Sequence, residues 1–418
     1  MISLFINSES LFRKVFMARK NLLKSPRRGR RSFPQAKYGP GKQRVKRDGQ
    51  YIDPAKFVNK AVPVPEQVVF NPEHRFTDFG FSPELERNLA DRGYVQPTPV
   101  QDAALKPVMA GRDLIGLANT GTGKTAAFML PIINRFQRDR NSGPALVIAP
   151  TRELAVQIDE EFRGFAKGLG LHSALCLGGM NIRPQITALR RRPQVIIGTP
   201  GRLKDLFQQK VLRLNHVSVV VLDEADRMLD MGFIKDIRFL LDQLPSERQS
   251  LCFSATMPGE IQRLVDGLLR DPITVSVRTR ETAEQINQDV IKARSKDEKI
   301  QILHDLLQKP EFDKVLIFGR TKWSVQRLSE TISKHGVKAE AIHGNKSQPQ
   351  RQRALKAFSA GNVNVLVATD VAARGLDIPD VSHVINFDQP NSYDDYVHRI
   401  GRTGRAGKAG QALTFVSH

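Results

Sequence analysis

The sequence predicts an α/β protein with two parallel β-sheets in tandem, each covered by helices on both faces, and a basic amino-terminal tail. Three observations support this. From about residue 73, short apolar runs rich in β-branched residues alternate with helical stretches. A polar segment, residues 278–286, then interrupts the pattern, and a second series of the same kind fills residues 287–418. Residues 1–72 lack such a pattern.

The apolar runs place the expected strands. The first series predicts strands at Asp113–Leu117, Ala145–Ala149, Val195–Gly198, Val219–Leu222, Ser250–Phe253 and Ile273–Val277. The second predicts strands at Val315–Phe318, Ala339–Ile342, Val365–Ala368, Val384–Phe387 and Ala412–Val416. Helices such as 152–169 and 259–269 separate most of them. Sheets of this type bind ligands beyond the carboxyl ends of their strands, so we expect functional residues directly after strands.

The composition excludes several classes of protein. The 418 residues are 40% hydrophobic, but no apolar run has the length needed to cross a bilayer, so we expect no membrane association. The two cysteines, Cys176 and Cys252, lie far apart in apolar stretches, which favours buried thiols in a reducing compartment over a disulfide framework or a zinc site.

The net charge of +21 is concentrated at the amino end. Residues 1–60 hold 16 Lys and Arg against 3 acidic residues, and the rest of the chain holds 48 against 40. A basic arm is typical of contact with a polyanion, most often nucleic acid, and the alternative is a solvated tail that only aids solubility. Its mixture of Gly, Pro, Arg and Lys predicts disorder. Residues 1–20, where apolar residues alternate with Ser, Arg and Lys, fit an amphipathic helix, an organellar targeting peptide or a true translation start at Met17.

A phosphate-binding loop follows the strand expected at 113–117 and opens a helix expected at 125–133. Its residues are Ala118, Asn119, Thr120, Gly121, Thr122, Gly123, Lys124 and Thr125. The glycines let backbone N–H groups approach phosphates, and a helix amino terminus favours an anion. Lys124 is expected to reach the β- and γ-phosphates, and the Thr125 hydroxyl to ligate Mg²⁺.

Two acidic residues follow the strand expected at 219–222. Asp223 is expected to hold Mg²⁺ through water, and Glu224 to position and deprotonate the attacking water. The alternative, an acidic helix cap, is disfavoured because a phosphate loop precedes this strand.

These motifs resemble those of the DEAD-box ATP-dependent RNA helicases, which belong to superfamily 2, and in particular its bacterial members. Residues 223–226 read Asp-Glu-Ala-Asp, and the phosphate loop has the family form Ala-x-x-Gly-x-Gly-Lys-Thr. The likeness covers about residues 75–416. It implies RecA-like domains at 73–277 and 287–418 with a linker at 278–286, ATP and Mg²⁺ as cofactors, and RNA as partner.

The resemblance also assigns nucleotide contacts. Gln96 and Gln101 match the element that reads adenine, and an amide that both donates and accepts suits the N6 and N7 edge. Phe76 matches an isolated aromatic that stacks on the base, although alone it would be taken for a core residue. Gly375 and Asp377 match residues that face the γ-phosphate and ribose.

Loops after other strands are implied to grip the RNA backbone. In the first domain they supply Pro150, Thr151, Arg152, Gly179, Thr199, Pro200, Gly201 and Arg202. In the second they supply Arg320, Thr321, Gln348, Arg351 and Thr369. Hydroxyls, arginines and helix amino termini all suit phosphate, although each loop alone would be taken for an ordinary helix cap.

Three further residues are implied to couple the domains, and two arginines to assist hydrolysis. Ser254 and Thr256 link ATP turnover to strand separation, and we expect their hydroxyls to bond the nearby acids; His398 bridges the domains. Arg402 and Arg405 match arginine fingers and complete a catalytic set with Lys124 and Glu224. Residues 398–405, with three arginines among glycines, predict a cationic, conformationally free loop.

The implied function is RNA-dependent ATP hydrolysis with local unwinding of short RNA duplexes or remodelling of RNA–protein complexes. Two alternatives remain open: an RNA clamp that closes without useful unwinding, and a DNA helicase of the same superfamily. We expect a cytoplasmic monomer, or an organellar protein if the source is eukaryotic. Ribosomal proteins and components of the RNA degradation machinery are the expected protein partners.

Overall fold

The computed structural model describes residues 52–60, 70–119, 121–277, 286–373, 378, 380–404 and 410–417. The tail up to residue 51 and the linker over 278–285 lie outside the described residues. So do four predicted site residues: Thr120, Gly375, Asp377 and Arg405.

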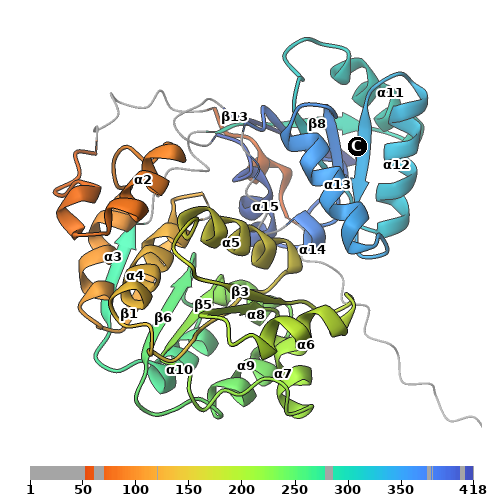
Figure 1. Ribbon diagram of the computed structural model, residues 1–418. Coiled ribbons are helices and arrows are strands. Elements are labelled where there is room, and N and C mark those ends of the chain that lie inside the picture. Colours follow the sequence, from red (N-terminus) through yellow and green to blue (C-terminus); the bar gives the residue numbers. More distant parts are fainter. Residues whose placement is uncertain are drawn as a thin grey trace, which may run out of the picture. The chain divides into compact units, whose positions relative to one another are not determined.

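A seven-stranded parallel sheet organises residues 70–277, called here the first lobe (Figure 1). Its strands lie in the order β3-β4-β2-β5-β6-β1-β7. Their bounds are β1 (Leu114–Ala118), β2 (Ala145–Ile148), β3 (Ser173–Cys176), β4 (Val195–Gly198), β5 (Val219–Asp223), β6 (Gln249–Ser254) and β7 (Ile273–Val277).

Helices cover both faces of this sheet, because successive residues of a strand point to opposite sides. In β2, Val147 joins the apolar cluster that holds α2 to α5, whereas Leu146 joins the cluster that holds α6 to α10. The helices of the first face are η2 (Phe76–Phe79), α2 (Pro83–Asp91), α3 (Pro99–Met109), α4 (Lys124–Arg138) and α5 (Arg152–Phe165). Those of the second are α6 (Ile182–Arg190), α7 (Pro200–Gln208), α8 (Ala225–Asp230), α9 (Ile234–Leu241) and α10 (Gly259–Leu268).

A six-stranded parallel sheet organises residues 286–417, the second lobe, in the order β10-β11-β9-β12-β13-β8. The strands are β8 (Ile286–Ala293), β9 (Val315–Phe318), β10 (Ala339–Ile342), β11 (Val365–Ala368), β12 (His383–Asn386) and β13 (Gly410–Ser417). Helices α11 (Lys296–Leu307) and α12 (Lys322–Lys334) cover one face. Helices α13 (Gln348–Ser359), α14 (Asp370–Ala373) and α15 (Tyr393–Ile400) pack on the other. The predicted α/β class, with two parallel sheets covered on both faces, is confirmed.

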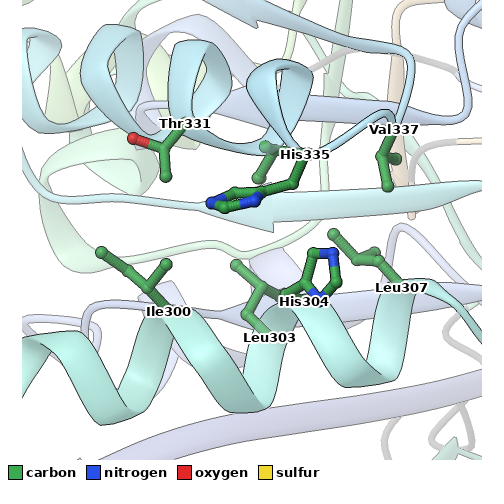
Figure 2. A pocket seen from close by; sticks show the side chains of 8 residues that line it. Ile300, Leu303, His304, Leu307, Thr331, His335 and Val337 are labelled. Carbon is green, nitrogen blue, oxygen red and sulfur yellow. The ribbon is translucent and has the colours of Figure 1, made fainter.

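Helices α11 and α12 face each other across a small apolar pocket, which Figure 2 shows. The rings of His304 and His335 meet there edge to face, with centroids 5.1 Å apart. None of the predicted site residues lines this pocket, so it belongs to the packing of the two helices.

Two strands, β3 and β8, were absent from the sequence-based expectation. Both lie at sheet edges, where one side of the strand meets few neighbours. Their polar or exposed residues therefore alternate with buried ones, and the continuous apolar runs of the central strands are lacking. Cys176 and Cys252 are buried free thiols, as expected. No helix in the described part of the chain is long and apolar enough to span a membrane.

Candidate functional site: the carboxyl ends of both sheets

The phosphate loop joins β1 to α4. Gly121 and Gly123 have φ values of +82° and +89°, which residues with a Cβ rarely adopt. Lys124 begins the helix and is buried, and its Nζ donates a hydrogen bond of 3.0 Å to the carbonyl of Ala118 at the end of β1. The ammonium group is thus folded back over its own loop, and its contact with the β- and γ-phosphates stays a prediction.

The element that is predicted to read adenine holds this loop in place. Gln101, fully buried on α3, donates from Nε2 to the carbonyl of Gly123 at 3.0 Å and accepts from the backbone N–H of Thr98 at 2.9 Å. The Thr98 hydroxyl donates to the carbonyl of Thr122 at 2.7 Å. Both ends of the Gln101 amide therefore have protein partners, and its contact with adenine stays a prediction.

Two other predicted base contacts differ in burial. Gln96 is exposed before α3. Phe76 is only 6% exposed and packs in the first lobe's core, with its ring 6.1 Å from that of Tyr94 at an interplanar angle of 70°. Its role as a stacking partner for the base stays a prediction.

Asp223 ends β5 and Glu224 follows it; the neighbouring strand β6 carries Ser254, and the phosphate loop follows β1, on the other side of β6. Asp223 is buried, and burial raises the pKa of its carboxyl to about 6, against the opposing attraction of Lys124. For Glu224, burial alone would raise the pKa, yet Arg227, Lys124 and Arg402 hold it below the ordinary value. Glu224 is therefore ionised at neutral pH.

Glu224 is also engaged by a residue that sequence reasoning missed. Its carboxylate forms a buried ion pair of 3.0 Å with Arg227, one helical turn away on α8. Glu224 has a φ of +56°, which is unusual for a residue with a Cβ. Such strained backbone conformations cluster at functional sites. The sequence did offer a signal for this ion pair, because Glu224 and Arg227 are three residues apart.

The residues expected to hold Mg²⁺ fit that ion. Asp223 Oδ1 is buried and has no hydrogen-bond partner among the described residues, so this oxygen could bind a cation or a water of its shell. Thr125 stands in the first turn of α4. In the described residues, no group of three or more His, Cys, Asp or Glu is arranged around a metal position. The carboxylate of Asp223 and the hydroxyl of Thr125 are oxygen donors, which suit Mg²⁺, an ion that takes few protein ligands and completes its shell with water and phosphate.

The Ser254-Ala255-Thr256 segment is bonded to the acidic motif. The Thr256 hydroxyl and backbone N–H both donate to Asp226 Oδ2, at 2.9 and 2.8 Å. The Ser254 hydroxyl accepts from the backbone N–H of Asp226 at 3.1 Å. The expected bond between a hydroxyl and an acidic side chain is confirmed for Thr256, whereas Ser254 bonds the backbone of that acid.

In the first lobe, three of the predicted RNA-binding loops follow the neighbouring strands β3, β4 and β2. The guanidinium of Arg152 lies against Gly179, where an added Cβ would overlap it. Arg202 donates to the carbonyl of Met180 at 3.3 Å. Thr151 caps α5, Thr199 precedes α7, Pro150 is buried and Gly201 faces open space. The sheet thus brings these loops together.

The second lobe repeats this arrangement at β10, β11 and β9. Thr321 caps α12, and the backbone N–H of Arg320 donates to Asp388 at 2.7 Å. Thr369 follows β11. Gln348 begins α13, and both polar atoms of its buried amide lack partners in the described residues.

Arg351 was expected to contact an RNA phosphate, but it is paired with an acidic residue of the protein. Its guanidinium forms a buried ion pair of 2.9 Å with Glu153 of α5. A phosphate would have to compete with this carboxylate, so an RNA contact by Arg351 stays a prediction.

The prediction of a free loop over 398–405 was wrong for its first part. His398 and Arg399 belong to α15, and Arg399 is 2% exposed. Its guanidinium is held by Asp370 through bonds of 2.6 and 2.8 Å, and by Asn386 and the Asp388 carbonyl at 3.1 and 2.7 Å. This buried network fixes the helix. Arg402 follows it, with Nε donating to the His398 carbonyl at 3.3 Å.

Comparison with known proteins assigns the family. Residues 98–264 match the DEAD/DEAH box helicase family, and residues 298–407 match the helicase conserved C-terminal domain. The chain is 46% identical over 345 residues to the DEAD-box ATP-dependent RNA helicase CshA of Geobacillus kaustophilus, covering 82% of this chain and 73% of that protein.

The chain belongs to the DEAD/DEAH box helicases.

A second DEAD-box relative, the ATP-dependent RNA helicase CshA of Listeria monocytogenes, is 45% identical over 344 residues. That match covers 82% of this chain and 66% of the relative, so the chain spans about two thirds of that relative's length. Among solved DEAD-box structures, Saccharomyces cerevisiae Dbp5 bound to RNA and ADP BeF3 is similar with a TM-score of 0.71 and 31% identity. It covers 82% of this chain and 90% of the Dbp5 chain. The DEAD-box likeness supports the RecA-like fold of both lobes.

Proposed function

We propose that this protein is an RNA-dependent ATPase that separates short RNA duplexes or remodels RNA–protein complexes. One observation carries the proposal. In the first sheet, the phosphate loop, the acidic motif and Ser254 follow the adjacent strands β1, β5 and β6, while the phosphate-gripping loops follow β2, β4 and β3. The loops for both ligands therefore lie at one edge of the sheet, and the Asp226–Thr256 bond joins two of the loops on the nucleotide side.

Three basic residues and one acid serve hydrolysis in this proposal. Lys124 leaves the Ala118 carbonyl for the β- and γ-phosphates. Glu224 leaves Arg227 to orient and deprotonate the attacking water, and its low pKa keeps it ionised for that task. Arg402 and Arg405 stabilise charge that develops in the transition state. Asp223 and Thr125 would hold Mg²⁺, which when bound neutralises phosphate charge.

RNA and ATP draw the two lobes together in this scheme and so complete the ATPase site. The proposed RNA contacts are hydroxyls, backbone N–H groups and arginines, which recognise phosphates and give little sequence specificity. Contacts to the 2′-OH would favour RNA over DNA. A bent single strand held by both lobes is incompatible with a duplex, so a few base pairs melt locally.

Several attributes remain predictions: a monomer, ribosomal or degradation-machinery partners, and the cytoplasm as compartment. The basic tail is proposed to add RNA affinity without sequence preference and to steepen its salt dependence.

Steady-state ATPase assays with structured RNA, and with DNA of equal length, test the proposal. Stimulation by RNA alone supports it, whereas equal stimulation by DNA would assign the protein to DNA. Glu224→Gln should lower turnover at least 100-fold while ATP and RNA stay bound. Tight ATP-dependent RNA binding by the unmutated chain with no turnover would favour the clamp.

A further inference from the structure

A short segment ahead of the first lobe, residues 52–60, is bound to the second lobe. Figure 1 shows this red-orange trace beside β13 and α15. Its 3₁₀ turn η1 (Pro54–Phe57) is capped by Asp53, which accepts from the backbone N–H of Ala55 at 2.9 Å. We call residues 52–60 the strap.

Phe57 anchors the strap. Its side chain is fully buried, and its ring lies 4.7 Å from that of Tyr396 on α15. The same apolar cluster contains Ile286, Tyr396, Ile400, Ala412 and Val416. The Phe57 ring thus fills the space between α15 and the strands β8 and β13, and Ile52 of the strap packs against the same cluster.

The strap also covers the edge of the second sheet. Asn59 pairs with Gln288 of the edge strand β8 through two antiparallel backbone bonds of 3.0 and 2.8 Å. The Gln288 side chain in turn accepts from the Tyr396 hydroxyl at 2.8 Å. The edge pairing and the buried ring therefore converge on the same residue of α15.

Helix α15 leads directly to a proposed arginine finger. Tyr396 and Ile400, one turn apart, face Phe57, and Arg402 lies two residues beyond the helix end, bonded to the His398 carbonyl. A shift of α15 would therefore move Arg402.

We propose that the strap is a positioning element for hydrolysis: Phe57 holds α15 so that Arg402 is placed for the γ-phosphate. The inference rests on the proposed ATPase function and deepens it.

Docking of the strap also gives the two lobes a second covalent connection. Residues 61–69 join the strap to a segment whose Phe76 and Phe79 pack in the first lobe's core, and residues 278–285 form the other connection. The ten residue steps from Lys60 to Phe70 span at most about 35 Å. A docked strap thus limits how far the lobes separate, which raises the effective concentration of each for the other.

The test uses the full chain at a temperature well below the melting point of every variant. Phe57→Ala should lower kcat for RNA-stimulated ATP hydrolysis about tenfold and change the KM for ATP less than twofold, because Arg402 acts in the transition state. Val58→Ala, at an adjacent residue that is 49% exposed, should match the unmutated protein. Asn59→Pro removes the edge donor without emptying the core and should lower kcat in the same sense, since Val58 already has the extended backbone that precedes proline.

A double mutant separates positioning from general damage. In an Arg402→Ala background, Phe57→Ala should lower kcat less than twofold further, because the residue through which it acts is already gone. An equal tenfold loss in that background, or normal kcat in folded Phe57→Ala, would overturn the proposal. If the unmutated chain shows no RNA-stimulated turnover, the proposed function fails instead, before any variant is compared.

Discussion

The buried hydrogen-bond network around Arg399 should contribute strongly to the stability of the second lobe. Arg399→Met keeps the length of the side chain but removes a buried guanidinium that makes two bonds to Asp370 and one each to Asn386 and the Asp388 carbonyl. Removing one partner of a buried ion pair costs about 3–5 kcal/mol. Because the Asp370 side chain is 18% exposed, we expect a loss of about 3 kcal/mol. With a urea m value of about 1.5 kcal/mol/M, the unfolding midpoint of the second lobe falls by about 2 M.

Hydrogen exchange followed by mass spectrometry across a urea series resolves the lobes. Peptides from β9 and β12 should lose protection in Arg399→Met, while peptides from β2 and β5 serve as the internal control. Combining Arg399→Met with Asp370→Asn should recover about 1–3 kcal/mol relative to the sum of the single changes. A loss below about 1 kcal/mol, or strict additivity, would refute the view that this pair holds α15 to α14.

Three further predictions concern the ligand sites. The folded pKa of Asp223, about 6, exceeds its ordinary 3.8, so the stability that this carboxyl contributes falls as pH rises between those values. Because cation and proton compete for it, the acid midpoint of ATPase activity should move to lower pH as Mg²⁺ is raised, and a midpoint indifferent to Mg²⁺ would contradict the assignment. Gly123→Ala should weaken ATP binding about 100-fold or more, because Gly123 has a φ of +89° and an added Cβ would overlap the Gln101 amide. As a control, Gly267→Ala within α10, where an added Cβ meets open space, should leave ATP binding unchanged. Trp323, the sole tryptophan, is 73% exposed in the first turn of α12, close in sequence to Thr321, so bound RNA should quench its fluorescence. An unaltered emission at saturating RNA would show that RNA does not contact the start of α12.

Much of the site could be predicted from local sequence patterns. The phosphate loop and the acidic pair are contiguous, and each follows a strand whose apolar run is visible without a structure. Because parallel strands align their carboxyl ends, that position alone indicated that the loops would gather at one sheet edge. The central strands, buried on both faces, were correspondingly easy to place, whereas the half-exposed edge strands β3 and β8 were not.

What the sequence by itself determined was therefore the α/β class, the two series of strands and the identity of the motifs, since these depend on neighbours along the chain. Only the tertiary structure decided which side chains are buried and which form ion pairs, hydrogen bonds or ring contacts with residues far away in the sequence. Arg399 and Asp370 are 29 residues apart, and the ring of Phe57 meets that of Tyr396 across most of the chain. Burial and pairing of this kind depend on how strands are ordered in a sheet, which no local pattern encodes. For the same reason, the first residues of the expected free loop over 398–405 belong to helix α15, and residues 52–60 of the predicted tail are bound to the second lobe.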